Sequence, residues 1–300
     1  MPTKKSRKIP FRGAGCALVT PFTSGAIDSD ALARMIEFQI GGGTDAIVLL
    51  GTTGESPAVE TDERQEMIAF AAERIAGRVP LIVGCGSNST AHAVFLTRLA
   101  CQAGADAILS VTPYYNKTNE DGLVRHFTEI ADASCCPVIL YNVPSRTNVD
   151  IPLTVYEKLS AHENIAGVKE SSGSMTRAGE ILAHTDLALY SGNDGDNVPL
   201  LALGASGVIS VLANVMPETV SRMCTAAFAG DFATASRLQT ETADLVRALF
   251  SDVNPIPVKA ACAAMGLCEG DLRLPLVPLD EAKRMRLVQA MKSAGIWVDG

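Results

Sequence analysis

Short apolar runs recur along the chain, and each is followed by a stretch with the apolar spacing of a helix. The runs cover residues 15–22, 45–51, 79–86, 106–113, 136–144, 165–170, 187–192 and 206–214. Neighbouring runs lie about 20 to 35 residues apart, a suitable length for one strand followed by one crossover helix. Because these runs are apolar nearly throughout, they indicate a parallel sheet that is covered on both faces.

Repetition of this unit predicts a closed α/β fold, the (β/α)8 or TIM barrel. An open, doubly wound sheet would be favoured by a glycine-rich phosphate-binding fingerprint after the first strand. Residues 20–28, TPFTSGAID, contain no such fingerprint. We therefore expect a barrel over residues 1–225 and a small helical C-terminal extension over residues 226–300.

Charge and composition narrow the classes of partner. The formal net charge of the chain is −8, which disfavours nucleic acid and anionic membranes as main partners. No apolar segment approaches the length of a membrane span, and the basic first eight residues are not followed by one, so we expect no secretory signal and a cytoplasmic protein. The eight cysteines and four histidines show no metal-ligand spacing, so we expect reduced thiols and no metal site.

Chemically useful side chains stand where the predicted strands end. They are Thr52 and Thr53, Tyr114 and Tyr115, Tyr141 and Arg146, Lys169, and Gly192 with Asn193. In a closed barrel the C-terminal ends of all strands share one rim, and barrel enzymes carry their chemistry there. Each residue alone also has a structural interpretation: a β-branched strand end for the threonines, aromatic packing for the tyrosines, and a solvated charge for Arg146.

Lys169 is the least expected of these residues, because it ends the buried strand IAGVK. A strand-end lysine can extend its ammonium group to solvent, or it can serve as an amine that attacks a carbonyl carbon. Burial can bring the pKa of a lysine from about 10.4 to roughly 7–8, which supplies free amine. The neighbouring tyrosine and threonine ends favour the reactive interpretation. Glu170 is expected on the opposite face of the strand, without a catalytic role.

An amine at this rim could form an imine with a 2-oxo acid, which would become an enamine and attack an aldehyde. This chemistry needs neither a metal nor a cofactor. Tyr141 could carry the protons, and Thr52 and Tyr115 could extend the relay to solvent. Thr52 and Thr53 could hold the carboxylate of the oxo acid, and Arg146 could clamp a second carboxylate.

The motifs GTTGESP, TPYYNK, YNVPSRT, GVKESSG, YSGND and NPIPVK occur in this order. Together they resemble the dihydrodipicolinate synthase (4-hydroxy-tetrahydrodipicolinate synthase) family, from about Gly13 to the C-terminal helices. The resemblance implies a barrel with a helical C-terminal part and a homotetramer built as a dimer of dimers. It also implies the condensation of pyruvate with L-aspartate-4-semialdehyde in the diaminopimelate route to lysine.

By this resemblance, Lys169 is the Schiff-base lysine, Tyr141 is the proton donor, and Thr52 and Tyr115 form the relay, with Tyr115 reaching the neighbouring subunit's site. The substrate-binding residues implied by the family are Thr53 and the backbone of Ile209 for pyruvate, Arg146 for the semialdehyde carboxylate, and Gly192 with Asn193 at the rim.

A possible effector site for lysine is matched by Ser56, Asn88 and Tyr114. His92 stands where lysine-inhibited members of the family carry an acid, and Thr61 and Arg64 stand where sensitive bacterial members often carry histidines. Because Arg64 would repel the ammonium group of lysine, we expect weak or absent feedback.

Three other functions remain open from the sequence. A related lyase, such as N-acetylneuraminate lyase or a 2-keto-3-deoxy sugar acid aldolase, would share Lys169, Tyr141 and the threonine pair, but Arg146 favours a short substrate with its own carboxylate. A non-catalytic scaffold would be expected to have lost part of the reactive set. A metal-dependent barrel hydrolase would need histidine ligands, which the strand ends lack.

Overall fold

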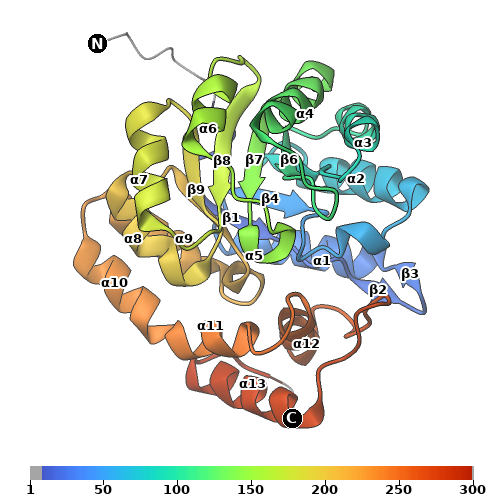
Figure 1. Ribbon diagram of the computed structural model, residues 1–300. Coiled ribbons are helices and arrows are strands. Elements are labelled where there is room, and N and C mark those ends of the chain that lie inside the picture. Colours follow the sequence, from blue (N-terminus) through green and yellow to red (C-terminus); the bar gives the residue numbers. More distant parts are fainter. Residues whose placement is uncertain (1–8, 299–300) are drawn as a thin grey trace.

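The computed structural model describes residues 9–298 of the chain. Within this range eight parallel strands form a closed barrel in the order β1-β10-β9-β8-β7-β6-β5-β4 (Figure 1). These strands are β1 (Gly13–Ala17), β4 (Ala46–Leu49), β5 (Leu81–Gly84), β6 (Ala107–Val111), β7 (Val138–Asn142), β8 (Ile165–Glu170), β9 (Ala188–Ser191) and β10 (Gly207–Ser210). Every predicted strand is present, so the TIM barrel is confirmed. Apart from β8, which coincides with its predicted run, the strands are shorter than the apolar runs.

A layer of helices surrounds the barrel. It consists of α1 (Ser29–Gly41), α2 (Thr61–Ile75), α3 (Thr90–Gln102), α4 (Glu120–Ala133), α6 (Leu153–Leu159), α7 (Met175–His184), α8 (Asn197–Leu203) and α9 (Pro217–Phe228). Side chains at the N-caps of several helices accept a backbone hydrogen bond, as Asp28 does from Ala31 and Ser174 does from Arg177. Such caps satisfy N–H groups that a helix leaves unpaired at its start. Short 3-10 helices span Ser56–Ala58, Asp194–Asp196 and Leu212–Asn214.

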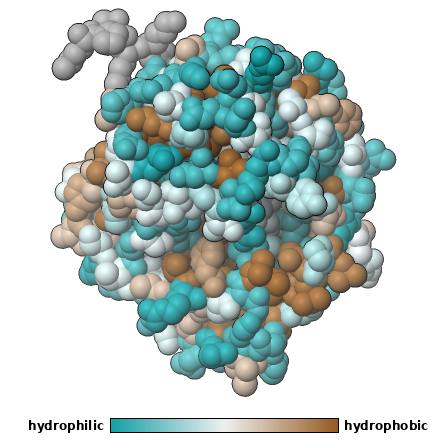
Figure 2. Space-filling view, in the orientation of Figure 1, coloured by the Kyte–Doolittle hydropathy of each residue, from teal (hydrophilic) through white to brown (hydrophobic). Residues whose placement is uncertain are grey.

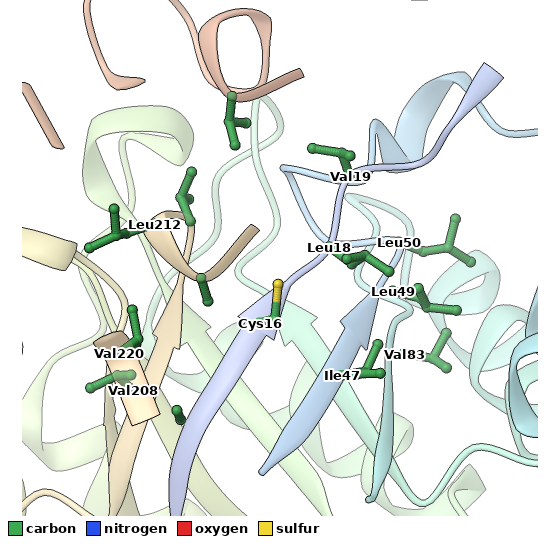
Figure 3. Packing of buried hydrophobic residues seen from close by; sticks show 14 of the residues in the cluster. Cys16, Leu18, Val19, Ile47, Leu49, Leu50, Val83, Val208, Leu212 and Val220 are labelled. Atoms are coloured by element: carbon green, nitrogen blue, oxygen red, sulfur yellow. The ribbon is translucent and has the colours of Figure 1, made fainter. Parts of the chain in front are cut away.

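The strands bury side chains on both faces, which explains their continuous apolar sequences. On β4, Ala46 and Val48 belong to the cluster inside the barrel, whereas Ile47 and Leu49 belong to the cluster outside it. Figure 3 shows part of the outer cluster, including Ile47, Leu49 and Val83, between the strands and the helices around them. The inner cluster also contains Tyr141, so the interior is packed up to the rim.

The C-terminal segment forms α10 (Phe232–Glu241), α11 (Ala243–Leu249), α12 (Ile256–Ala264) and α13 (Glu281–Ser293). Figure 1 shows α11 and α12 on the side of the barrel where the strands end, next to the short helix α5 (Pro144–Thr147). The expected division at residue 225 falls inside α9 and stays a prediction. The hairpin of β2 (Phe22–Thr23) and β3 (Ala26–Ile27) was not predicted, because each strand has only two residues.

Among residues 9–298, no helix combines the length and the hydropathy needed to cross a membrane. The basic first eight residues lie outside the described range. The cytoplasmic location stays a prediction.

Candidate active site

Lys169 and Tyr141 occupy paired positions on the neighbouring strands β8 and β7. Both side chains are buried, with 6% and 7% of their surfaces exposed. The Nζ atom of Lys169 lies 4.4 Å from the centroid of the Tyr141 ring. The strand alternates, so that Val168 belongs to the outer cluster while Lys169 faces the interior beside Tyr141. The structure therefore brings the predicted amine and the predicted proton carrier together at the rim.

Glu170 lies on the outer face of β8, as expected from the strand alternation. Its carboxylate accepts hydrogen bonds from Asn142 Nδ2 at 3.1 Å and from the backbone N–H of Ser172 at 2.6 Å. Burial raises the pKa of this carboxyl group, and the hydrogen bonds from Ser172 and Asn142 oppose the shift. The contact fastens the ends of β7 and β8 to each other, which fixes the strands that carry Tyr141 and Lys169.

Gly192 leaves the space that the lysine side chain occupies. A Cβ atom at this position would lie 2.9 Å from Lys169 Cε and 1.9 Å from Ser171 Oγ. Any larger residue would therefore have to displace both of these side chains. The next residue, Asn193, donates from Nδ2 to Asp196 at 3.0 Å. Ile209 is fully buried in the inner cluster that also contains Tyr141.

The loop after β4 carries the two predicted threonines. Thr53 is buried, and its Oγ1 accepts a hydrogen bond from Asn254 Nδ2 at 3.0 Å. Thr52 is only partly buried and lines a cavity at the rim. Asn254 lies in the C-terminal segment just before α12. The hydroxyl group of Thr53 is therefore positioned by a residue 201 positions away.

An ion pair with both side chains completely buried fastens the same loop to the C-terminal segment. Glu55 accepts a hydrogen bond from Lys259 Nζ, and it also accepts one from the backbone N–H of Arg273 at 3.0 Å. Burial lowers the pKa of Lys259, and the hydrogen bond to Glu55 opposes this shift. The pairing of these two residues was not predicted from the sequence. GTTGESP and NPIPVK contain them, but nothing in the two motifs shows that they meet.

A cavity of about 380 Å³ opens at this rim. Its lining includes Thr52, Tyr141, Arg146 and Asn254, together with the exposed apolar side chain of Leu274. Figure 2 shows hydrophobic residues gathered below the centre of this face, where Figure 1 places α5 and α12. Lys169 is not part of the lining, because it lies beside the Tyr141 ring deeper in the barrel.

Arg146 is exposed on α5, and its Nη2 atom donates to the backbone carbonyl of Asn254 at 3.0 Å. Its guanidinium group therefore lies at the mouth of the cavity with further donors available. Tyr114 lines the same cavity. Tyr115 does not: its side chain is 93% exposed and its backbone φ is 66°. Within one chain, Thr52, Tyr141 and Arg146 line one cavity and Lys169 lies beside Tyr141, whereas Tyr115 is apart from them.

Two of the four residues of the expected effector site, Ser56 and Tyr114, interact with Arg64, which is buried. Arg64 Nη2 donates to the Ser56 hydroxyl at 2.6 Å, and Arg64 Nη1 donates to the Gly84 carbonyl at 3.3 Å. Burial lowers the pKa of Arg64. The Asn88 carbonyl accepts from Asn116 at 2.9 Å. His92 Nδ1 lies 3.3 Å from the Ser87 hydroxyl, and Tyr114 interacts electrostatically with Arg64.

The cysteines differ from the expectation of scattered thiols without metal-ligand geometry. The fold brings the Sγ atoms of Cys101, Cys135 and Cys136 within 4.8 Å of one another. Residue spacing could not reveal this group, because Cys101 is separated from the other two by helix α4. The three thiols lie away from the rim, at the end of α3 and in the connection from α4 to β7.

Comparisons with known proteins extend over nearly the whole chain. Residues 10–294 match the model of the dihydrodipicolinate synthetase family. The 4-hydroxy-tetrahydrodipicolinate synthase of Geobacter sulfurreducens is 49% identical over 284 residues, which cover 94% of this chain and 98% of the relative. That of Methanosarcina acetivorans is 47% identical over 290 residues, covering 95% and 99%. The crystal structure of dihydrodipicolinate synthase from Aquifex aeolicus superposes with a TM-score of 0.95 at 43% identity, covering 97% of this chain and all of that one. The chain therefore belongs to the dihydrodipicolinate synthetase family and has the lyase function of 4-hydroxy-tetrahydrodipicolinate synthesis.

Proposed function

We propose that Lys169 forms a Schiff base with pyruvate and that the resulting enamine condenses with L-aspartate-4-semialdehyde. The observation that carries this proposal is the buried amine of Lys169, 4.4 Å from the centroid of the Tyr141 ring, on paired strand positions. A buried amine beside a group that exchanges protons is the arrangement that nucleophilic catalysis by lysine requires. The reaction belongs to the biosynthesis of diaminopimelate and lysine.

The steps balance without a metal or a cofactor. Lys169 Nζ attacks C2 of pyruvate, water leaves, and a protonated imine remains. This imine withdraws electrons, so C3 loses a proton and becomes the nucleophilic carbon of an enamine. That carbon attacks the aldehyde carbon of the semialdehyde, whose oxygen takes up a proton. The amino group of the same substrate then adds to C2 and displaces Lys169, which closes the ring.

Tyr141 carries protons to and from the adduct on Lys169, and Thr52 and Tyr115 extend this relay. The position of Thr52 in the cavity lining supports its part. Tyr115 is 93% exposed, so it is available to enter the site of a second copy of the chain. This exposure supports the proposed homotetramer, a dimer of dimers in which neighbouring subunits exchange Tyr115.

The carboxylates of the two reactants bind at different parts of the rim. Thr52, Thr53 and the backbone of Ile209 hold pyruvate near Lys169, and Arg146 binds the carboxylate of the semialdehyde at the cavity mouth. A guanidinium group can bind both oxygens of a carboxylate at once. Gly192 and Asn193 shape the rim beside Lys169, where the missing Cβ of Gly192 leaves room for the amine.

Reduction with borohydride in the presence of pyruvate tests the covalent step. We expect one pyruvate-derived adduct per chain, mapped by peptide mass spectrometry to Lys169. Lys259 is an internal control, because it is also buried but is paired with Glu55. An adduct on another lysine, or no adduct, would contradict the proposal. A coupled assay with the semialdehyde and a panel of sugar acids distinguishes the related lyases, which would turn over the sugar acids instead.

A further inference from the structure

Three cysteines converge at the end of the barrel opposite the catalytic rim. Cys101 lies in the last turn of α3, shortly before β6 begins. Cys135 and Cys136 form the connection from α4 to β7. Figure 1 shows α3 and α4 side by side on the outside of the barrel. In the described range, residues 9–298, the three cysteines form the one group of at least three cysteine, histidine or carboxylate side chains whose ligand atoms lie close enough together to hold a metal ion.

Hydrogen bonds fix the loop that carries two of the thiols. The backbone N–H of Cys135 donates to Cys101 Sγ at 3.0 Å, so it joins the two chain segments. The Ser134 hydroxyl donates to the Cys136 carbonyl at 2.6 Å and accepts from the Cys136 N–H at 3.3 Å. Asn164 Nδ2 donates to the Ser134 carbonyl at 3.2 Å. Outer contacts of this kind orient the ligands in protein metal sites.

We propose that Cys101, Cys135 and Cys136 form a three-thiolate binding site for a thiophilic metal cation such as Zn²⁺. Tetrahedral zinc with Zn–S bonds of about 2.3 Å needs sulfur atoms about 3.8 Å apart. The three Sγ atoms lie within 4.8 Å of one another, so small side-chain rotations bring them to this spacing. Thiolate ligands favour soft or borderline cations over Mg²⁺ and Ca²⁺.

Binding the ion releases the three thiol protons to solvent as the sulfur atoms become thiolates. Cys135 is exposed and the other two are partly buried, so the ion can enter from solution. A water molecule would complete the tetrahedron on the exposed side. The ion would then tie the end of α3 to the start of β7, the strand that carries Tyr141 at its other end.

The number of converging thiols favours a metal site over a disulfide. A disulfide uses two sulfur atoms and would leave the third without a function, whereas a metal uses all three. The chain offers an internal comparison, because Cys262 and Cys268 interact as a buried pair but, within residues 9–298, form no group of three thiols within 4.8 Å, although Cys16 acts electrostatically on Cys262. The three-cysteine site is separate from the Lys169 chemistry, so the two proposals can fail independently.

The test uses the full-length protein, reduced and desalted under argon, and Co²⁺ as a spectroscopic probe. We expect thiolate-to-cobalt charge-transfer bands and tetrahedral d–d bands that saturate at one ion per chain and disappear when Zn²⁺ is added. Cys101→Ser, Cys135→Ser and Cys136→Ser should each lose these bands and bind Zn²⁺ at least about tenfold more weakly. Cys268→Ala, the matched control, should keep them. All four variants should retain the condensation activity, which shows that they fold.

Three results would overturn the proposal. The first is reduced wild-type protein that shows no cobalt bands. The second is cobalt bands that survive in the three serine variants. The third is air-oxidised protein whose intact mass shows the loss of two hydrogens from this group, and which takes up no metal after reduction. That third outcome would assign the cysteines to a redox pair instead.

Discussion

The two ends of the barrel are held together in different ways. At the catalytic rim, buried polar groups find partners far along the chain: Glu55 meets Lys259, and Thr53 meets Asn254. At the opposite end, Asp106 Oδ2 accepts from the Leu81 N–H of the neighbouring strand unit at 2.9 Å, and Tyr190 of β9 donates to the carbonyl of Phe11 just before β1 at 2.8 Å. The rim therefore depends on the C-terminal helices for its geometry, whereas the contacts at the other end are made by the strand units and the segment just before β1. Substitutions at the two ends should separate activity from stability.

The largest effect is expected at the amine itself. Lys169→Arg keeps a positive charge of similar reach, but a guanidinium group does not lose its proton in proteins and cannot form the imine. Steady-state kinetics should show a loss of at least about a thousandfold in kcat, with a melting temperature close to that of the wild type. Lys158→Arg makes the same exchange at an exposed position on α6 and should leave kcat unchanged. Retention of activity within tenfold of wild type would refute the role of Lys169.

The buried ion pair should give the next largest effect, now on stability and activity together. Glu55→Gln leaves the ammonium group of Lys259 without its counter-charge in a site with no exposed surface. Removing one partner of a buried pair costs about 3–5 kcal/mol of unfolding free energy. The loop with Thr52 and Thr53 should also loosen, which lowers kcat/KM. Urea denaturation and kinetics measure the two effects.

Two control variants test this prediction. One changes both members of the same ion pair, and the other changes a residue at the opposite end of the barrel. The double variant of Glu55→Gln with Lys259→Met should recover part of the lost stability, because no unpaired charge remains. Asp106→Ala removes one hydrogen bond at the opposite end and should cost about 1 kcal/mol while kcat stays at the wild-type value. If Glu55→Gln behaved like Asp106→Ala, the contrast between the two ends would be wrong.

The same contrast explains which features the sequence could reveal. The strands were predictable because both faces of each strand are buried, which leaves continuous apolar runs such as that around Ile47. The rim was predictable because parallel strands end together, so polar side chains after separate strands had to meet. Asn254, the Glu55–Lys259 pair and the three-cysteine site were not predictable. Their partners come from segments that neither a strand period nor a helix period relates to one another.

A buried histidine in the helical layer between the two ends should make the protein sensitive to acid. Burial lowers the pKa of His126 from 6.5 to about 4; its Nε2 has no hydrogen-bond partner, while Nδ1 lies 2.8 Å from the Thr90 hydroxyl. The folded chain therefore binds a proton less readily than the unfolded chain does. The stability that this neutral histidine provides is complete above pH 6.5 and is lost as the pH falls toward 4, by about 3 kcal/mol.

His126→Phe should remove most of this dependence, since the phenyl ring carries no titrating group. The measurement compares the unfolding free energies of both proteins at pH 7 and pH 4.5. Other groups titrate alike in the two proteins, so the difference isolates His126. If His126→Phe lost as much stability between pH 7 and pH 4.5 as the wild type, His126 would not be the source of the acid sensitivity. kcat at pH 7 should not change, because His126 does not line the rim cavity.

The smallest effect is expected from lysine, at the edge of the rim. Arg64 holds the Ser56 hydroxyl at 2.6 Å and interacts electrostatically with Tyr114, so it places a positive charge beside two residues of the expected effector site. An incoming ammonium group would meet this charge instead of a carboxylate, and His92 supplies no negative charge. Millimolar L-lysine should therefore change the condensation rate little or not at all. Strong inhibition by micromolar L-lysine would show that the ammonium group finds another partner and that Arg64 does not exclude lysine from the site.

Arg64→Ala provides the comparison, because it removes the charge and frees the Ser56 hydroxyl. If the repulsion argument holds, lysine should inhibit this variant more than the wild type, and equal responses would locate the cause elsewhere.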